Sequence, residues 1–428
     1  MMGLLRKSYS LVSYLLVPLA VGNLLWRSLR VPDYRRRIGE RFGFGSVRSS
    51  TQSVIWLHAV SVGEVQAAFP LVQALLRDFP DHKLLMTTVT PTGAGRVESL
   101  FSDRVDHRYV PYDTPGAVRR FFQRVNPSVA VILETELWPN LYRACGRCQV
   151  PLVLASARIS PRSVDRYRWA KRLVSDALSH GVVIAAQSQE DADRFLALGA
   201  APERTWVTGN IKFDIELDES QQMLGRALRQ QQFAGRPTWI AASTHEGEEQ
   251  IVLKAHQRVL AQHPLAVLIL VPRHPERFER VAQQIRAQGL GFARRSRHEE
   301  LKTDDGIYLA DSLGELIGLY AAADVAFVAG SLVPIGGHSL LEPAAVGTAM
   351  IAGPHNHNAQ YIADKFVDAG GLKIAADGDA LAERVIALLD DPQRRSALVR
   401  NAAQCLNENR GAVARLLALL EPLIERSD

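Results

Sequence analysis

Cysteine is scarce in this sequence: its 428 residues include only three, Cys145, Cys148 and Cys405. Three cysteines cannot build the disulfide framework of a small secreted domain, so a reducing compartment is the simpler expectation. Cys145 and Cys148 form a CxxC pair, but no second pair accompanies it. Because zinc needs further ligands, a metal site is not expected.

The common fingerprints of phosphate and metal binding are missing as well. No GxGxxG follows the first apolar run, and neither GxxxxGK[ST] nor HExxH occurs in the chain. Dinucleotide binding, P-loop phosphate binding and metalloprotease chemistry therefore lose their usual support.

Acidic residues are rare at the N-terminus. The first fifty residues hold nine Lys or Arg against two acids, a net +7, whereas the whole chain carries +5, so the rest carries −2. The positive charge therefore marks one segment and does not indicate a protein that binds nucleic acid.

The 19 residues from Ser8 to Trp26 carry no charge at all. As a helix they would extend about 28 Å, close to the thickness of a bilayer core. A signal-anchor helix, a helix lying in the membrane surface, a cleaved signal peptide and a helix packed on its own domain all fit this pattern. The arginines from Arg27 to Arg41 favour a membrane anchor, with the rest of the chain in the cytoplasm and the basic segment on anionic lipid headgroups.

From residue 54 onward, apolar strand-like runs alternate with amphipathic helix patterns. Continuous apolar strands separated by helices indicate parallel sheets covered on both faces. The runs expected as strands are Val54–His58, Leu84–Thr88, Ala130–Leu133, Leu152–Ala155, Val182–Ala186, Trp206–Thr208, Trp239–Ala242, Ala266–Val271, Ile307–Leu309, Val325–Ala329 and Ala349–Ala352.

The alternation of strand and helix patterns is interrupted once, in Phe213–Arg236, which is rich in Gln, Glu and Arg. We therefore predict an α/β protein with an N-terminal anchor at 1–30, a first Rossmann-like domain at 31–212, a linker at 213–236, and a second such domain with a helical tail at 237–428. A return of the tail to the first domain is the alternative. Two doubly wound domains facing across a cleft are typical of nucleotide-sugar glycosyltransferases.

The first candidate site lies in Val54–Phe69, VIWLHAVSVGEVQAAF, which predicts a strand, a tight loop and a helix start. Ligands of open α/β sheets bind outside the carboxyl ends of the strands, which is where Glu64 would lie. The structural alternative is that Glu64 is only a first-turn acid favoured by the helix dipole. Glu134 and Glu136 follow a second strand, and Lys212 follows the last strand of that domain.

The second domain has its own polar clusters at expected strand ends. Ser243 to Glu246 fits a capping box, for which a structural role is the default. Arg273 follows the next strand and suits a phosphate or carboxylate. Gly336 and Gly337 are expected to open a helix towards a ligand, with Glu342 placed for ribose hydroxyls.

In this order, HAVSVGE, TPTGAGR, ETELWPN, GNIKFD, ASTHEGEE, PRHPERF, DSLGELIGLY and GGHSLLEPAA resemble the 3-deoxy-D-manno-octulosonic acid (Kdo) transferases of lipopolysaccharide assembly. The resemblance extends from the N-terminal segment to about residue 360. It implies a GT-B glycosyltransferase fold, CMP-Kdo as the donor, and no further cofactor. It also implies a lipid A precursor (lipid IVA) as the acceptor, at the cytoplasmic face of a Gram-negative inner membrane.

The same resemblance implies roles for individual residues. Glu64 matches the general base of an inverting transfer, and Glu134 and Lys212 match positions that support the transition state. The residues implied to contact CMP are Pro272, Arg273, Leu313, Gly314, Glu315, Ser339, Leu340, Leu341 and Glu342. Two alternatives stay open: a membrane-associated GT-B transferase that uses a UDP-sugar, and a non-catalytic nucleotide-binding scaffold.

Overall fold

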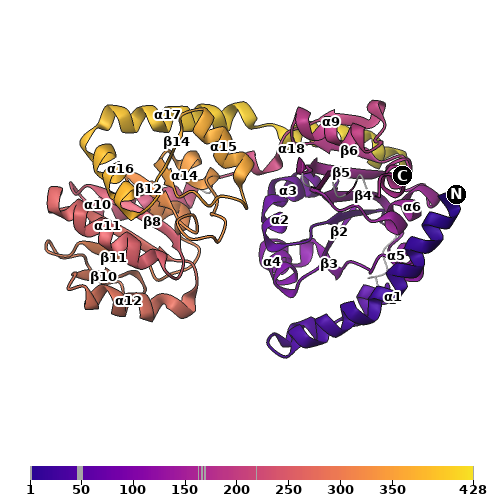
Figure 1. The fold of residues 1–428 in the computed structure, drawn as a ribbon, viewed down its shortest axis with the longest axis horizontal. Helices are drawn as coiled ribbons and strands as arrows, with labels where there is room; N and C mark the ends of the chain where they lie inside the picture. Colours follow the sequence, from indigo (N-terminus) through magenta and orange to yellow (C-terminus); the bar gives the residue numbers. More distant parts are fainter. Residues whose placement is uncertain are drawn as a thin grey trace. The chain divides into compact units, whose positions relative to one another are not determined.

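The computed structural model describes residues 2–45, 52–161, 163, 164, 167, 170–217 and 219–427. Arg48, counted above in the basic segment, lies outside these residues. The chain forms two compact units (Figure 1). Unit 1 comprises Met1–Asp214 and Arg410–Asp428, and unit 2 comprises Ile215–Asn409.

Unit 1 is built on a seven-stranded sheet of order β3-β2-β1-β4-β5-β6-β7, in which every pair is parallel. Its strands are β1 (Val54–His58), β2 (Lys83–Thr88), β3 (Asp106–Tyr109), β4 (Pro127–Leu133), β5 (Leu152–Ala157), β6 (Val183–Ala186) and β7 (Thr205–Val207). Its helices are α1 (Met2–Ser28), α2 (Val62–Ala67), α3 (Phe69–Asp78), α4 (Pro91–Phe101), α5 (Pro115–Val125), α6 (Pro139–Arg147), α8 (Lys171–Leu178), α9 (Gln189–Ala197) and α18 (Ala412–Ile424). Short 3-10 turns include η1 (Pro32–Arg35), η2 (Ile38–Phe42), η3 (Ser102–Arg104), η4 (Pro202–Arg204), η5 (Ile211–Phe213) and η8 (Glu425–Ser427).

Unit 2 repeats the plan with a parallel sheet of order β10-β11-β9-β8-β12-β13-β14. Its strands are β8 (Thr238–Thr244), β9 (Val267–Pro272), β10 (Phe292–Arg294), β11 (Ile307–Leu309), β12 (Val325–Val328), β13 (Ala349–Ala352) and β14 (Leu372–Ile374). Its helices are α10 (Glu219–Gln232), α11 (Glu248–Gln262), α12 (Phe278–Ala287), α13 (Leu316–Ala321), α14 (Leu341–Val346), α15 (Gln360–Asp368), α16 (Gly378–Asp390) and α17 (Pro392–Asn409), with 3-10 turns η6 (Pro275–Arg277) and η7 (Arg295–Arg297).

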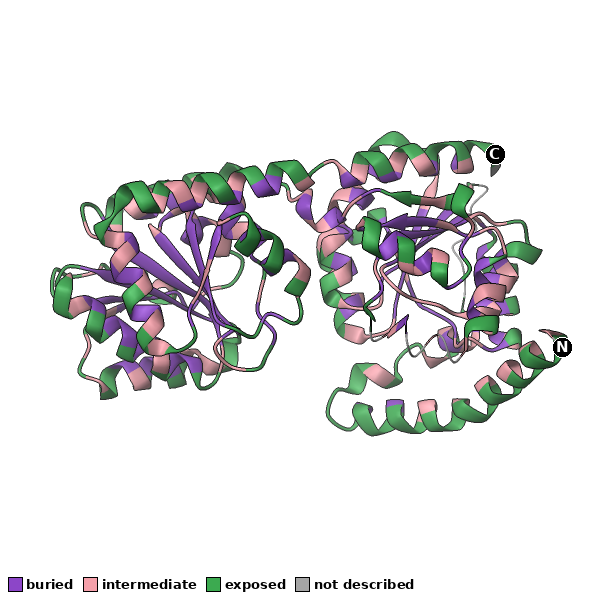
Figure 2. Cartoon of the chain, turned by 45° about the horizontal axis from the view of Figure 1, so that its top comes forward, coloured by how far each residue is buried: buried purple, intermediate pink, exposed green. Residues whose placement is uncertain are grey.

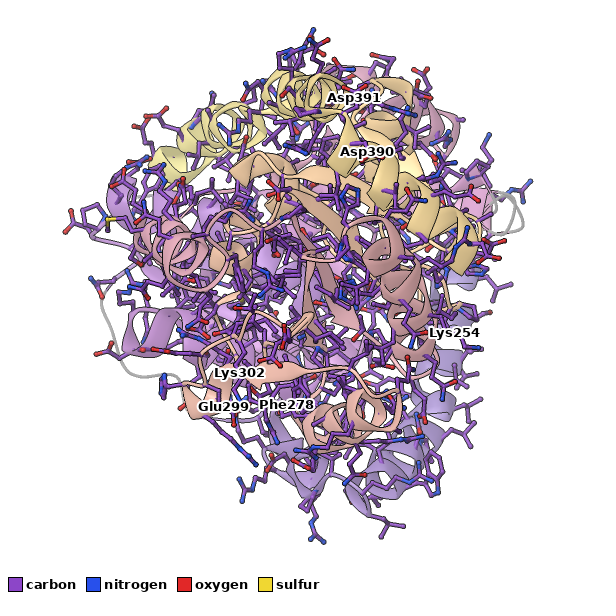
Figure 3. All side chains as sticks on the ribbon, turned by 90° about the vertical axis from the view of Figure 1, so that its left-hand side faces the viewer. Lys254, Phe278, Glu299, Lys302, Asp390 and Asp391 are labelled. Carbon is purple, nitrogen blue, oxygen red and sulfur yellow. The ribbon has the colours of Figure 1, made fainter. Side chains whose placement is uncertain are left out.

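The interior strands of both sheets are buried on both faces, as their apolar sequences require, whereas Trp206 and Val207 of the edge strand β7 are exposed. Figure 2 shows most of the strands buried and the outer helix surfaces exposed. The surface of unit 2 mixes charges of both signs, including Lys254, Lys302, Asp390 and Asp391, which Figure 3 labels. The predicted pair of Rossmann-like α/β folds is confirmed.

The predicted linker differs from the structure, because α10 belongs to unit 2 and packs against α13. Gly225 of α10 and Gly318 of α13 allow the two backbones to touch: a Cβ added at Gly225 would lie 2.3 Å from the Gly318 carbonyl oxygen. Such close packing of two helices requires residues without side chains.

The C-terminal boundary differs too, since residues from Arg410 onward return to unit 1. The Asp214 carboxylate accepts hydrogen bonds from the Gly411 and Val413 backbone N–H groups at 2.6 and 2.5 Å, which caps α18. Leu416 and Leu420 of α18 are fully buried in the unit 1 core. The α18 helix also holds the segment after β7, because Nε of Arg415 donates to the Thr208 carbonyl oxygen.

Helix α1 lies along unit 1 with one side inward. Arg6 forms an ion pair with Asp176 of α8, the Tyr9 hydroxyl donates to Asp113, and the Gly116 N–H donates to the Tyr14 hydroxyl. The opposite side is apolar and exposed, with Leu11, Leu15 and Leu19 at 61, 66 and 70% exposure. By length and composition α1 could cross a membrane.

The capping of α18 gives a test by hydrogen exchange. Replacing Asp214 with Ala removes the acceptor for two backbone N–H groups, a loss on the order of 1–2 kcal/mol. We expect amide exchange in Ala412–Ile424 to accelerate roughly 5- to 30-fold. Asp377→Ala, which removes the cap on α16 in unit 2, is the matched control and should accelerate only α16. Unchanged protection of α18 in Asp214→Ala would contradict the role of Asp214.

Candidate active site

The predicted residues of unit 1 gather where its strand order reverses. β1 and β4 are neighbours in the sheet, but the chain continues from β1 to β2 on one side and from β4 to β5 on the other. His58 at the end of β1 is in register with Thr87 of β2 and Ile132 of β4. The carboxyl ends of these strands are therefore level. Open α/β sheets bind their ligands at this switch point. The loop with Glu64 follows β1, and the loop with Glu134 follows β4.

Glu64 is the third residue of α2, in its first turn, and its carboxylate binds the loop between β1 and α2. Oε2 accepts a hydrogen bond from the Val60 N–H at 2.7 Å, and Oε1 accepts one from the Ser61 hydroxyl at 3.2 Å. Ser61 is also the N-cap of α2. The structural role that the sequence left open, a first-turn acid, is thus present, and Glu64 remains half-buried at the sheet edge.

The environment of Glu64 raises its pKa from 4.5 to about 7. Burial is the largest cause, and the negative charges of Glu134 and Glu136 add to it, whereas the hydrogen bonds from Val60 and Ser61 oppose it. A carboxyl group with a pKa near neutrality can accept a proton efficiently at physiological pH.

Glu134 and Lys212 form an ion pair, with Nζ of Lys212 2.7 Å from Oε1 of Glu134. Lys212 reaches β4 because the chain after β7 turns back across the sheet edge, where the Thr208 and Gly209 N–H groups donate to the Ala186 carbonyl oxygen of β6. Glu134 has a φ of +57°, which is uncommon for a residue with a side chain and costs conformational energy. Strain of this kind clusters at functional sites.

Sequence reasoning gave Glu136, Trp138 and His58 no individual role. The Glu136 carboxylate accepts a hydrogen bond from Nε1 of Trp138 at 2.7 Å, and burial raises its pKa. The Trp138 ring packs against His58, 5.3 Å between centroids. Burial lowers the pKa of His58 to about 4, so its ring is neutral at pH 7. The sequence signal that could have identified these three residues was their position at or after the ends of two adjacent strands, β1 and β4.

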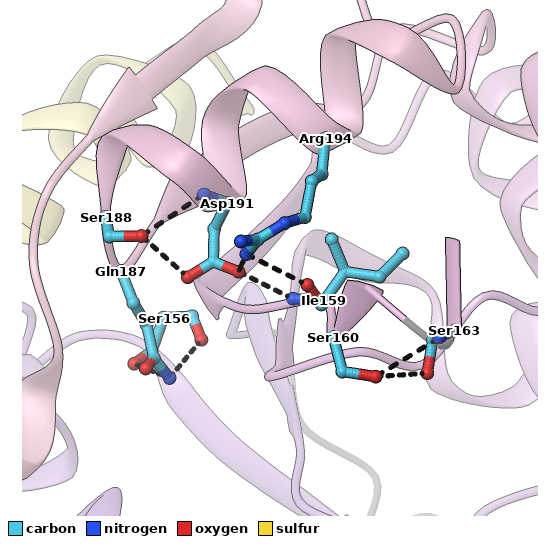
Figure 4. A network of polar contacts seen from close by, with 8 residues as sticks. All are labelled: Ser156, Ile159, Ser160, Ser163, Gln187, Ser188, Asp191 and Arg194. Carbon is cyan, nitrogen blue, oxygen red and sulfur yellow. Dashed lines mark hydrogen bonds and ion pairs between the residues drawn. The ribbon is translucent and has the colours of Figure 1, made fainter. Parts of the chain in front are cut away.

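A further polar network fixes the loop after β5 (Figure 4). The Asp191 carboxylate accepts from the Ile159 N–H at 2.9 Å and pairs with Arg194, and Nε2 of Gln187 donates to the Ser156 carbonyl oxygen at 2.9 Å. Ser156 has a φ of +50°. The carboxyl edge of the unit 1 sheet is therefore held by satisfied polar contacts beyond the predicted residues.

Unit 2 has a switch point of its own between β8 and β12. His245 follows β8 and His338 follows β12, and their Nε2 atoms lie 2.8 Å apart with the rings nearly parallel. Burial lowers the pKa of His338 to about 4, helped by His245 and Arg273, and also lowers the pKa of His245. A bond between two ring nitrogens needs one donor and one acceptor, so neutral rings suit this geometry.

The charge of Arg273 acts on this histidine pair and also on Glu342. Arg273 follows Pro272, the last residue of β9, and its side chain is exposed. Burial raises the pKa of Glu342 to about 7, and the positive charge of Arg273 opposes this shift. A guanidinium close to two imidazoles and a carboxyl group can hold a phosphate while the carboxyl group receives hydroxyl donors.

The other residues predicted to contact CMP differ in how accessible their side chains are. The Leu313 side chain is 67% exposed and Gly314 has a φ of +85°, but the Glu315 carboxylate is occupied by Arg295, which lowers its pKa. Leu340 and Leu341 are buried, so only their backbone can meet a ligand, whereas Ser339 is exposed.

Two sequence interpretations in unit 2 were wrong. Gly336 and Gly337 do not open a helix: both N–H groups donate to the Gly330 carbonyl oxygen, and α14 begins only at Leu341. These amides are therefore not free to bind phosphate.

The capping box at Ser243 to Glu246 is also absent, because α11 begins at Glu248 after Gly247. The acid that acts there is the buried Glu248, whose carboxylate accepts hydrogen bonds from the N–H groups of His245, Gly330, Ser331 and Leu332. It ties the loop after β8 to the loop after β12 and supports the histidine pair. Among the described residues, no group of three or more His, Cys, Asp or Glu side chains could hold a metal ion.

Comparison with known proteins agrees with this arrangement. The family described as 3-deoxy-D-manno-octulosonic-acid transferase (kdotransferase) matches residues 36–215, and the family described as glycosyl transferases group 1 matches residues 238–404. The 3-deoxy-D-manno-octulosonic acid transferase of Haemophilus influenzae is 42% identical over 402 residues, which cover 94% of both chains. This chain belongs to the Kdo transferase family.

A second Kdo transferase, from Bordetella pertussis, is 38% identical over 393 residues, which cover 89% of this chain and 90% of its own. Among solved structures, Anabaena Alr3699/HepE in complex with UDP has a TM-score of 0.55 at 17% identity and covers 87% of this chain and 99% of its own. That likeness concerns the fold alone. The predicted Kdo transferase family and the GT-B fold are confirmed, and the chain is a glycosyltransferase.

The charges around Glu64 predict the pH dependence of sugar transfer in this Kdo transferase. If Glu64 must be ionised, the rate rises with pH and is half-maximal near pH 7. Glu134→Gln removes a negative charge that raises the pKa of Glu64, so the rising limb should move to lower pH. Lys212→Met leaves the Glu134 charge unopposed, so the limb should move to higher pH.

The measurement is kcat/KM against pH for the wild type and each variant. Glu98→Gln, which neutralises an exposed acid of α4, is the control and should leave the limb in place. Shifts of the same sign in Glu134→Gln and Lys212→Met would contradict the electrostatic account.

Proposed function

We propose that this Kdo transferase moves Kdo from CMP-Kdo to a lipid A precursor, lipid IVA, by an inverting displacement in which Glu64 is the general base. The observation that carries the proposal is the half-buried Glu64 carboxyl group, with a pKa of about 7, at the switch point of unit 1. Membership of the Kdo transferase family supports the sugar, and the names of the relatives support no particular acceptor.

The proposed step is a single displacement. The oxygen of a glucosamine hydroxyl forms a bond to the anomeric carbon of Kdo, and its proton passes to Glu64. The bond between that carbon and the phosphate oxygen breaks, and its electron pair leaves with CMP. A base contributes typically 10²–10⁴ in rate to such a step. Lys212, held by Glu134 at 2.7 Å, supplies positive charge near the reacting centre.

In unit 2 we assign the CMP phosphate to Arg273 and the ribose hydroxyls to Glu342. The exposed guanidinium and the neutral His245–His338 pair support this assignment, because they offer donors to an anion. Leu313, Gly314 and Ser339 are accessible for further contacts, and Pro272, Leu340 and Leu341 would contribute through their backbone. Glu315 would act indirectly, through its ion pair with Arg295.

The relatives and the apolar α1 suggest membrane association. We further propose the cytoplasmic face of the inner membrane, with α1 lying in the plane of the bilayer surface. A spanning α1 would draw Asp176 and Asp113 of unit 1 into the hydrocarbon, because Arg6 and Tyr9 are bound to them. Charged groups at that depth are costly. An in-plane helix instead buries its exposed leucines and leaves the arginines from Arg27 to Arg41 among headgroups.

The roles of Glu64 and Arg273 can be separated by two variants. Glu64→Gln should lower transfer to lipid IVA by roughly 10²–10⁴ with unchanged CMP affinity. Arg273→Gln should weaken CMP binding about 10- to 100-fold, the value of a hydrogen bond to a charged group. Calorimetric titration with CMP and UMP measures binding, and product masses measure transfer. Retained turnover in Glu64→Gln would remove Glu64 from the base role, and preference for UMP would favour the UDP-sugar alternative.

The orientation of α1 is tested by a protease-cleavable tag at the N-terminus. An in-plane α1 keeps the tag on the same side as the catalytic units, so cleavage occurs in inverted inner-membrane vesicles and not in intact spheroplasts. A spanning helix gives the reverse pattern. A tag at the C-terminus is the control for the side of the catalytic units, and cleavage of the N-terminal tag in spheroplasts would contradict the in-plane orientation.

A further inference from the structure

A groove of about 620 Å³ runs between α5 and α6 on unit 1, outside the site described above. Pro115 and Gly116 line it at the start of α5, and Arg147 and Cys148 line it at the end of α6. The volume lies within the range on the order of 300–1,000 Å³ that is usual for small-molecule sites.

All the charged residues that line the groove are arginines. Val118 and Phe122 close its base but are almost fully buried in the core, and Ala144 is partly exposed. Its charged lining residues are Arg119, Arg143 and Arg147. Its lining contains no Asp or Glu. Within the described ranges, no carboxylate forms an ion pair with any of these three arginines.

The arginines reinforce one another. Arg143 and Arg147 are four residues apart and therefore lie on one face of α6. Burial lowers the pKa of Arg143, and the neighbouring charges of Arg147 and Arg6 lower it further, while Asp176 opposes them. Asp176 is itself paired with Arg6. Asp176 therefore compensates only part of the positive charge, and the groove suits an anion.

The groove opens beside α1. Tyr14 of α1 lines it, the Gly116 N–H donates to the Tyr14 hydroxyl, and the Ser10 hydroxyl donates to Asn140 at the start of α6. Helix α1 therefore crosses the beginnings of α5 and α6, and its exposed leucines face away from them. The groove therefore opens next to the helix that would meet the bilayer.

We infer that this groove binds an anionic phospholipid of the bilayer, with the headgroup phosphate at Arg119, Arg143 and Arg147. The inference rests on the proposed membrane association of α1. It assigns to these helices a lipid that is not the sugar acceptor, because the lining residues include none of the acids grouped around Glu64.

Cys148 provides a direct readout. It is exposed and lines the groove, whereas Cys145 and Cys405 are buried. Alkylation of native protein therefore reports on Cys148. With all protein bound to vesicles, phosphatidylglycerol should slow its alkylation severalfold and pure phosphatidylcholine should not. Equal protection by both lipids would overturn the inference, since it would reflect burial against any bilayer.

Paired variants separate the groove from general attraction to the membrane. Arg143→Gln/Arg147→Gln should lower partitioning onto phosphatidylglycerol vesicles about 30-fold, the effect of roughly two headgroup-bound cations, and should abolish Cys148 protection at saturating vesicles. Arg35→Gln/Arg36→Gln, in the basic segment, should lower partitioning but keep the protection. Arg394→Gln/Arg400→Gln, exposed on α17, should change neither. Full protection in Arg143→Gln/Arg147→Gln would overturn the inference.

Transfer in detergent distinguishes this inference from the proposed function. With lipid IVA dispersed in detergent, Arg143→Gln/Arg147→Gln should keep the wild-type rate. Loss of that rate, or protection of Cys148 by lipid IVA and not by phosphatidylglycerol, would mean that the groove takes the acceptor and would overturn the phospholipid assignment. Absence of transfer in the wild type would refute the proposed function, while the protection experiment would still decide the groove.

Discussion

The site of unit 1 depends on how the charges of three acidic side chains are stabilised at the carboxyl ends of the parallel strands. Glu64, Glu134 and Glu136 lie near one another, and burial together with mutual repulsion makes ionisation of Glu64 costly. Lys212 offsets part of that charge through its 2.7 Å contact with Glu134. The two hydrogen bonds that the Glu64 carboxylate accepts stabilise its ionised form and lower its pKa. The balance leaves Glu64 with a pKa of about 7, so that about half of the carboxyl groups are ionised at neutral pH and the carboxylate is basic enough to take a proton.

The segment after β7 takes a path that brings Lys212 to Glu134. Lys212 comes from beyond the edge strand β7 and must cross the sheet edge to reach β4. The segment that carries it is held from both sides: Asp214 caps α18, and Arg415 of α18 donates to the Thr208 carbonyl oxygen. The return of the C-terminal helix to unit 1 thus supports the cation that faces Glu134. In unit 2, buried Glu248 performs the comparable task, because its four backbone hydrogen bonds join the loops with His245 and Gly330.

Every interior strand of both sheets could be predicted from the sequence, whereas of the four edge strands only β7 was expected. All eleven expected strands are present, while β3, β10 and β14 were not expected, and each of these is an edge strand. An edge strand has one neighbour and tolerates polar residues such as Asp106 and Arg294, so its sequence lacks the continuous apolar run. The helix expected to start after the first strand is divided at Ala68, because Pro70 lies in the first turn of a new helix, α3.

The site shows the same limit. Glu64, Glu134 and Lys212 were predicted, and the structure brings them together because parallel strands end at one edge. Motif spacing could not reveal that Gly336 and Gly337 close a turn on Gly330, or that Glu248 takes the place of the expected capping box. The Glu248 carboxylate binds backbone N–H groups 82 to 84 residues away, a contact that no local pattern encodes. The turn at Gly336 and Gly337 is local, but a Gly-Gly pair is compatible with either a turn or a helix start.

The central claim is that the Glu64 carboxyl group exchanges its proton near neutral pH in the folded enzyme. Infrared difference spectroscopy of the wild type against Glu64→Gln measures this directly, since the band of a protonated carboxyl group disappears as the group ionises. The account predicts one such band that titrates near pH 7 and is absent from the variant. A Glu64 band that vanishes near pH 4.5, the ordinary range of a glutamate, would contradict it.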